Sequence, residues 1–139
     1  LLRMNPSVAE QPVTEAEWLA RYIVRKQHVR RDGTVKPDPF IPFKYVELSV
    51  TRHLELSEER IWDIGDRVAS QTNTQLQGRA DAQASSYIRQ RLRVVAAPAE
   101  HNPNHANVVD WPSDKQAQKE IALELVKHVR YKTKPITAS

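Results

Sequence analysis

The chain has 139 residues, no cysteine and a formal net charge of +4 at neutral pH. This length favours one domain, because a chain of this size buries about two-thirds of the surface that its unfolded form exposes. The lack of cysteine excludes disulfides, cysteine-ligated zinc and a cysteine nucleophile. No apolar run is long enough for a signal peptide or a membrane helix, so we expect a soluble, cytoplasmic protein that does not act at a membrane.

The first predicted element is a helix over residues 14–29. Thr14 and Glu17 have the spacing of a capping box, in which the threonine oxygen accepts the Glu17 amide and the glutamate reaches back. The apolar residues that follow share one helical face: Trp18, Leu19, Tyr22 and Ile23. Residues 1–13 are expected to form a flexible segment. After the helix, the Asp32-Gly33 dipeptide predicts a turn, and the closely spaced prolines of "VKPDPFIPF" predict a stiff loop.

A strand and a second helix come next. Apolar and polar residues alternate over residues 44–51, with Val46, Leu48 and Val50 on one side, which predicts a strand with one face in the core. Ser57 can cap a helix that runs to about Ser70, because acids in the first turn suit the positive end of the helix dipole. Its inner face is predicted to be Ile61, Ile64, Gly65 and Val68.

The second half of the chain predicts two strands and two helices. Residues 81–90 fit a short helix better than an alternating strand. Residues 91–97 and 106–111 have the composition of strands, and the short connection between them predicts an antiparallel hairpin. Ser113 and Gln116 form another capping box, which predicts a final helix that ends near Arg130. Residues 131–139 are expected to be a flexible tail.

This order of elements predicts an α+β fold. We expect a single domain over residues 14–130, with a small, mostly antiparallel sheet of about three strands packed against three or four helices. The sequence contains no internal repeat and no low-complexity tract. One hydrophobic core should therefore hold the whole domain together.

Arg52 is the first candidate for a functional residue, because it continues the inward parity of Val46, Leu48 and Val50. An arginine that points into a core must find a carboxylate, a phosphate or several carbonyl groups, since an unpaired buried charge is very costly. Arg52 is therefore expected to bind a ligand anion, to form an internal ion pair, or to face solvent if the strand ends at Val50. Its neighbour His53 points the other way and is a candidate general base.

Two further candidates, His101 and His105, lie in the stretch "HNPNHANVVDWP". Pro103 between them excludes a helical metal-binding pair, and no HExxH or comparable pattern is present, so no metal site is predicted. The Asn-Pro-Asn sequence is typical of a turn whose amide side chains satisfy its own backbone. Catalysis therefore has no assigned residue, and the candidates are Arg52, His53, His101 and His105.

Basic residues cluster in three segments of the sequence, residues 21–36, 79–93 and 127–134. Arginine side chains suit phosphate, so these segments are candidate anion-binding surfaces if the fold gathers them, and ordinary solvated charge if it scatters them. Together with Arg52, the candidate ligand-binding residues are Arg25, Arg30, Arg31, Arg89, Arg91 and Arg93. No nucleic-acid-binding signature and no glycine-rich phosphate loop is present, so no nucleotide cofactor is predicted.

Three functions follow as alternatives. The first is a small binding module that uses arginines to engage an anionic partner, either a nucleic-acid backbone or an acidic protein surface. The second is a hydrolase or transferase for a phosphorylated or nucleotide substrate, which requires Arg52 to meet His53 or His105 in one pocket. The third is a structural or oligomerisation subunit, in which Trp62, Trp111 and the "FIPF" stretch form a contact surface with a second copy or another protein.

Overall fold

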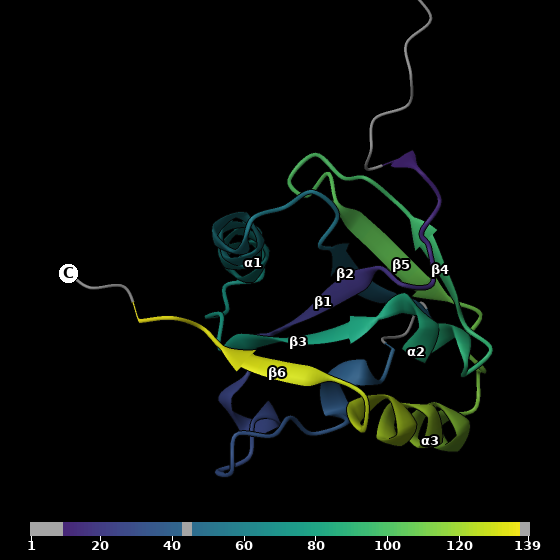
Figure 1. Cartoon of the computed structure of the whole chain (residues 1–139). Helices are drawn as coiled ribbons and strands as arrows, with labels where there is room; N and C mark the ends of the chain where they lie inside the picture. The colour runs from purple at the N-terminus through teal and green to yellow at the C-terminus, as the bar shows by residue number, and fades with distance from the viewer. Residues whose placement is uncertain (1–9, 43–45, 137–139) are drawn as a thin grey trace, which may run out of the picture.

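The computed structural model describes residues 10–42 and 46–136, and within these ranges it forms one α+β domain (Figure 1). A six-stranded antiparallel sheet has the strand order β4-β5-β2-β1-β3-β6. The strands are β1 Trp18–Ile23, β2 Leu48–Arg52, β3 Gly78–Gln83, β4 Arg93–Ala96, β5 His105–Val109 and β6 Arg130–Thr133. The helices are α1 Glu58–Gln71, α2 Ala84–Ile88 and α3 Lys115–Val126, with short 3-10 turns η2 Lys26–His28 and η3 Asp38–Phe40.

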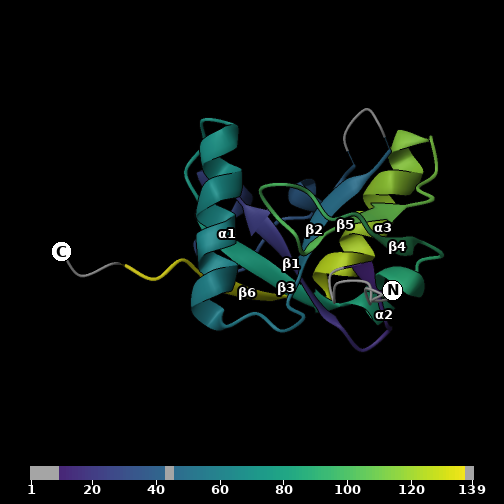
Figure 2. The same cartoon turned by 90° about the horizontal axis from the view of Figure 1, so that it is seen from above.

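The sheet separates two helical layers (Figures 1 and 2). Helix α1 packs on one face through a small apolar cluster that includes Tyr22 and Ile64. Helices α2 and α3 lie on the other face, over a larger core that includes Leu19, Tyr87 and Leu125. The α+β class and the single domain are confirmed, but the sheet has six strands where the sequence predicts about three.

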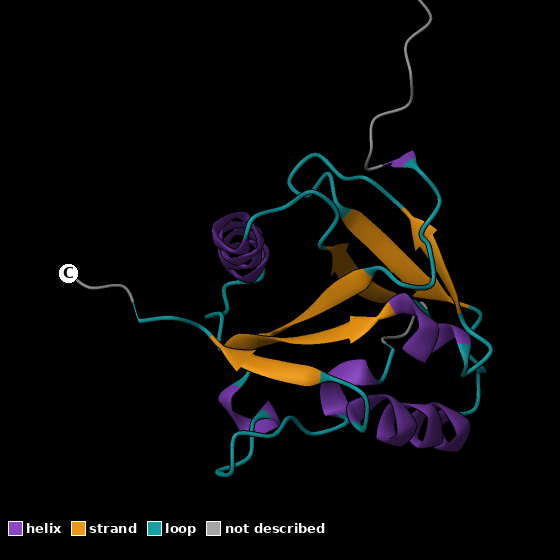
Figure 3. Cartoon of the chain, viewed as in Figure 1, coloured by secondary structure: helices purple, strands orange, loops and turns teal. Residues whose placement is uncertain are grey.

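The prediction of a helix over residues 14–29 is wrong, because its apolar part is the central strand β1 (Figure 3). Leu19 and Ile23 pack into the larger core on one face, while Ala20 and Tyr22 pack under α1 on the other. A strand that is buried on both faces is mostly apolar along its length, and such a stretch can also satisfy helical spacing. Pairing with two neighbouring strands decides between the two conformations.

The turn before β1 contains half of the predicted capping box. The Thr14 backbone amide donates to Glu17 Oε2 at 2.7 Å, and the Glu17 amide donates to the Thr14 carbonyl at 3.2 Å. The glutamate therefore reaches back as predicted, but the chain continues into β1 and no helix follows. The local motif specifies the turn and leaves the next element to the sheet.

The helix after Ser57 is confirmed. The Ser57 hydroxyl accepts a hydrogen bond from the Arg60 amide at 3.2 Å, and α1 buries Ile61, Ile64 and Gly65 against the sheet. Helix α3 differs in its details, because its cap is Asp114, whose carboxylate accepts from the Ala117 amide, and it ends at Val126. A carboxylate favours the positive end of the helix dipole more strongly than a serine hydroxyl does.

Strands replace helix or tail at two other places. Residues 78–83 form β3, so the predicted helix over 81–90 shrinks to α2. Residues 130–133 form the edge strand β6 on β3, where the sequence predicts the end of a helix and a tail. Both differences arise from pairing between segments far apart in the chain, which local spacing does not record.

The remaining predictions fall close to the observed elements. The antiparallel hairpin is confirmed as β4 and β5. Strand β2 begins at Leu48, and residues 44–45 of the predicted strand lie outside the described residues. The segments predicted to be flexible, residues 1–13 and 131–139, include residues 1–9 and 137–139, which also lie outside them.

Gly65 is where α1 approaches β1 most closely. A Cβ atom added there would lie 2.6 Å from Tyr22 Cε1 and 2.9 Å from Leu76 Cδ2. The Tyr22 ring cannot move away freely, because its hydroxyl donates to the Ile61 carbonyl at 2.5 Å.

We predict that Gly65→Ala lowers the free energy of unfolding by about 1 to 3 kcal/mol, the usual cost of overpacking a core. Urea denaturation of the variant measures the loss. Ser70→Ala, at an exposed position of the same helix, is the matched control and should change stability little. A stability gain for Gly65→Ala, as expected from helix propensity alone, would contradict the close packing of α1 on Tyr22.

Candidate functional site

The sheet opens between its two central strands. Strands β1 and β2 are paired at Leu19 with Arg52 and at Ala20 with Thr51, and the described register contains no further rung between them. On their other sides, β1 is paired with β3 along its whole length, and β2 is paired with β5 from Leu48 to Thr51. The strands therefore diverge beyond Ala20, and we call this opening the β1–β2 fork.

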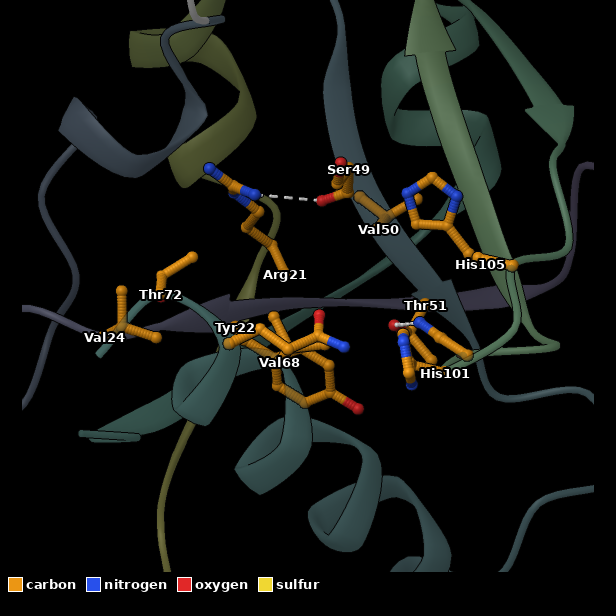
Figure 4. Close-up of a pocket in the computed structure, with 13 residues that line it drawn as sticks. Arg21, Tyr22, Val24, Ser49, Val50, Thr51, Val68, Thr72, His101 and His105 are labelled. Carbon is orange, nitrogen blue, oxygen red and sulfur yellow. Dashed lines mark hydrogen bonds between the residues drawn. The ribbon is translucent and has the colours of Figure 1, made fainter. Parts of the chain in front are cut away.

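Arg21 spans the β1–β2 fork. Its Nη1 donates to the Ser49 carbonyl of β2 at 3.0 Å, and its Nε donates to the Pro39 carbonyl of η3 at 2.8 Å (Figure 4). Its Nη2 makes no hydrogen bond to any residue in the described part of the chain. The guanidinium thus replaces the missing ladder bonds on one side and keeps donor capacity on the other.

A pocket of about 410 Å³ lies over the β1–β2 fork, between the sheet and α1. We call it the fork pocket; its walls come from β1, β2, α1 and the loop that enters β5 (Figure 4). Its apolar lining includes Val24, Val50 and Val68. Its polar lining residues include Arg21, Ser49, Thr51, His101, Asn102 and His105. The Arg21 side chain leaves β1 on the face that carries Leu19 and Ile23 and crosses the gap between the strands to Ser49. This volume falls in the range of small-molecule sites.

The loop before β5 is fastened to β2 by two buried asparagines. The Asn102 side chain donates to the Thr51 hydroxyl at 2.7 Å. The Asn104 side chain donates to the carbonyls of Arg52 and Leu54 at 3.0 and 2.9 Å. The sequence predicts that these amides satisfy their own turn, but in the structure they mainly satisfy the end of β2. They hold the loop beside the fork pocket.

His105 enters the fork pocket with a defined tautomer. It lies opposite Thr51 in the register of β2 and β5, and its Nδ1 is 2.9 Å from the Ala97 carbonyl. A carbonyl can only accept, so Nδ1 carries the proton and Nε2 of the neutral ring is an acceptor. His101, from the same loop, lies at the exposed end of the pocket. Protonation of either ring would add positive charge there.

The charge of the fork pocket is positive. None of the described residues that line it is acidic, and Arg21 forms no ion pair with any carboxylate of the described residues. Burial lowers the pKa of the Arg21 guanidinium. Desolvation without a compensating carboxylate makes a cation a favourable site for an anion.

Arg52 forms the internal ion pair that is one of its three predicted alternatives. Its Nε and Nη2 donate to the two Glu17 carboxylate oxygens at 2.7 and 3.0 Å, and its Nη1 donates to the Gln11 carbonyl at 2.7 Å. The Arg52 side chain is 1% exposed. This two-pronged geometry fastens the turn before β1 to β2 and leaves Arg52 without a role in the fork pocket.

The predicted enzymatic arrangement does not assemble. Thr51 and His105 share one face of the sheet, and Arg52, the next residue along β2, points to the opposite face. His53 contacts Asp81 on the α1 side, at the far side of β1 from the fork pocket. Arg52 therefore meets neither histidine, and we do not assign it a catalytic role.

The exposed arginines fall into two separate groups. Arg25, Arg30 and Arg31 lie around η2, which is purple-blue at the lower left of Figure 1, whereas Arg89, Arg91 and Arg93 lie around α2 and β4, at the right. Arg93 is paired with Asp110 at 2.6 Å, and Arg30 donates to the Val35 carbonyl. The fold does not gather these residues into one basic surface.

The aromatic contact surface is also dispersed. Trp111 is 6% exposed in the larger core, and Phe40 of the "FIPF" stretch is fully buried there. Trp62 stacks on Arg79, with the guanidinium carbon 4.7 Å from the ring centroid. These side chains stabilise the domain, and within the described residues they do not form an exposed patch.

Comparison with known proteins identifies no relative: no family model matches the chain, and neither a curated protein nor a solved structure matches it. Among the described residues, no three histidine or acidic side chains are placed to hold a metal ion. No helix in the described ranges has the length and apolar character needed to cross a bilayer. The fork pocket is therefore interpreted from its own geometry.

Sequence analysis missed Arg21, Ser49 and Thr51 as pocket residues. Only Arg21 follows from the strand assignment of residues 18–23, which the helical interpretation hides. Ser49 and Thr51 lie on the predicted strand β2, and they become pocket residues because α1 and the loop before β5 pack beside that strand. With those residues extended, Arg21 shares a face with Leu19 and Ile23 and becomes a charge that points inward, the same signal that singles out Arg52. The missed signal was the alternation of side chains between the two faces of a strand.

We predict that Glu17→Gln lowers the free energy of unfolding by about 3 kcal/mol, because it leaves the Arg52 cation buried without its carboxylate. Urea denaturation measures this loss. Glu15→Gln, at an exposed neighbouring position, is the matched control. Replacing both partners, in Glu17→Met with Arg52→Met, should cost less than the single change, and an equal or larger loss would contradict the ion-pair explanation.

The same pair makes stability depend on pH. Burial raises the pKa of Glu17, but hydrogen bonds from Arg52 and Thr14 outweigh it and hold the pKa below its ordinary value of 4.5. A carboxyl group with a lowered folded-state pKa stabilises the protein fully above the unfolded value and loses this contribution as the pH falls. We predict that the stability difference between the natural chain and Glu17→Gln is constant near neutral pH and shrinks below about pH 4.5. Denaturation curves across this range test it.

Proposed function

We propose that this protein is a binding module for an anionic partner, and that it holds the anion in the fork pocket. The observation that carries the proposal is Arg21, a half-buried cation that has no carboxylate partner among the described residues and lines a concave site. An anion at Arg21 would supply the charge that the protein itself leaves out. The proposal agrees with the sequence prediction in its anionic partner. It differs in the binding residue, which is Arg21 and not one of the exposed arginines.

The walls of the fork pocket favour a ligand that carries an apolar group beside its anionic group. Val24, Val50 and Val68 offer apolar contact, whereas Ser49 and Thr51 offer hydroxyl groups. A bare inorganic ion would leave the apolar walls exposed to water. A ligand in which a carboxylate or phosphate is attached to an apolar or aromatic group would cover them. We therefore expect one anionic group and one apolar group within a volume of about 410 Å³.

His105 favours the same ligand class. Its neutral ring presents an acceptor at Nε2, and its protonated ring presents a donor and a second positive charge. A protonated His105 would therefore strengthen the binding of an anion. His101 at the mouth of the fork pocket acts in the same direction.

We predict that Arg21→Gln weakens the binding of benzoate and phenyl phosphate about tenfold or more, because a hydrogen bond to a charged group contributes about 1.5 to 3 kcal/mol. NMR titration measures the affinity, with Thr51 and His105 as reporter amides. Arg25→Gln, an exposed arginine of the same segment, is the matched control and should bind as the natural chain does.

A nucleic-acid partner that engages the exposed arginines would give a different result. An oligonucleotide would then bind with affinity that falls steeply with salt, and the loss would follow a triple replacement of Arg25, Arg30 and Arg31 by glutamine. Arg21→Gln would leave that binding intact. Such an outcome, with no binding of either small anion, would refute the fork pocket as the functional site.

A further inference from the structure

A second concave site lies on the opposite side of α1, toward β3 and β6. It has a volume of about 200 Å³ and is lined by Trp18, His53, Glu58, Asp81, Arg130 and Lys132. We call it the α1 groove. Its lining residues include members of β1, β3 and β6, which are neighbours in the sheet. Within the sheet, Ala20 of β1 pairs with Asp81 of β3, and Asp81 pairs with Arg130 of β6. The α1 groove shares none of its lining residues with the fork pocket.

His53 in the α1 groove has a fixed orientation. Its Nε2 lies 3.2 Å from Asp81 Oδ1, and the Asp81 side chain is 4% exposed. An ionised carboxylate can only accept, so Nε2 of His53 carries a proton in both charge states of the ring. The other ring nitrogen, Nδ1, makes no hydrogen bond to any residue in the described ranges.

Asp81 has a second partner, the guanidinium of Arg79. Arg79 Nε donates to both Asp81 oxygens at 3.1 and 3.0 Å, and Arg79 Nη2 donates to both Glu58 oxygens at 2.7 and 2.9 Å. The Arg79 side chain is fully buried against Trp62. Arg79 compensates the carboxylates, so they do not by themselves neutralise the cations at the groove rim.

Two cations on the edge strand β6 complete the α1 groove. Arg130 lies over the Trp18 ring, 4.8 Å from its centroid, and forms no ion pair with a carboxylate of the described residues. Lys132 reaches Glu58 at 3.4 Å, a long contact between two side chains that are 49% and 62% exposed. Exposed pairs of this kind are weak, so Lys132 can turn to a stronger anion.

We propose that the α1 groove is a second anion site, specific for a compact dianionic oxyanion such as the phosphoryl group of a phosphate monoester. Arg130 and Lys132 supply the permanent charge, and His53 Nδ1 donates to the oxyanion when the ring is protonated. The volume of about 200 Å³ suits one tetrahedral group and leaves the rest of a larger ligand outside. This site differs from the fork pocket, where apolar walls call for an apolar body.

The charges around His53 set the pH dependence. Asp81 and Arg79 come from β3, Glu58 from α1, and Arg130 and Lys132 from β6. These five groups are three cations and two carboxylates, so the α1 groove carries a net positive charge even when His53 is neutral. Protonation of His53 adds one more charge beside the oxyanion. Affinity should therefore rise as the pH falls.

Inorganic sulfate is the probe, because it remains a dianion across the range in which imidazoles titrate. NMR titrations of the full chain at about pH 5 and pH 8 follow the His53 ring nitrogens and the β6 amides. We expect sulfate to bind about tenfold more tightly at the lower pH, as one added charge-assisted hydrogen bond predicts. In His53→Gln, whose amide can still donate to Asp81, this pH dependence should disappear.

The variant Arg130→Gln with Lys132→Gln tests the permanent charges. We expect it to weaken sulfate binding about tenfold or more at both pH values. Both side chains are exposed, so the domain should remain folded. Arg89→Gln with Lys119→Gln removes the same charge from exposed positions outside the groove and serves as the matched control.

Two outcomes would overturn the proposal: sulfate shifts confined to the fork pocket, or an equal loss of binding in the control double variant. Arg21→Gln separates this site from the fork pocket, because it should leave the His53 titration with sulfate unchanged. A failure of benzoate to bind would refute the fork pocket and not the α1 groove.

Discussion

The short pairing between β1 and β2 is the constraint on which the rest of the molecule depends. These central strands are joined at two rungs, and arginines fasten both ends of the contact. Arg52 holds the turn before β1 through Glu17, and Arg21 bridges the open end to Ser49. The fork pocket therefore exists because the two strands part while their outer neighbours keep them in one sheet.

The arginines of this protein have distinct roles that burial alone does not reveal. Arg52 and Arg79 are the most deeply buried, and each is paired with carboxylates, so they stabilise the fold. A buried cation with its partner contributes mainly through the cost of breaking the pair. Arg21 and Arg130 lack such a partner among the described residues and line cavities. These uncompensated arginines are the ones that we propose for anion binding.

Helix α1 separates the two candidate sites and supports both. It covers the middle of one sheet face through Ile61, Ile64 and the close approach of Gly65 to Tyr22, and it leaves the flanks of that face open. The fork pocket lies on one flank, where valines dominate the walls, and the α1 groove lies on the other, where charges dominate. One rigid helix thus creates two pockets of different chemistry on the same surface.

The sequence by itself determined the α+β class, the α1 helix with its Ser57 cap and the β4–β5 hairpin, because capping, dipole and short-turn signals act between residues close in the chain. It also marked Arg52 as a charge in need of a partner, through strand parity. Only the tertiary structure decided that residues 18–23 are a strand, that residues 130–133 complete the sheet, and that Arg21 and His105 share a pocket. An apolar run buried on both faces fits two periodicities equally well, and only pairing with distant strands selects one.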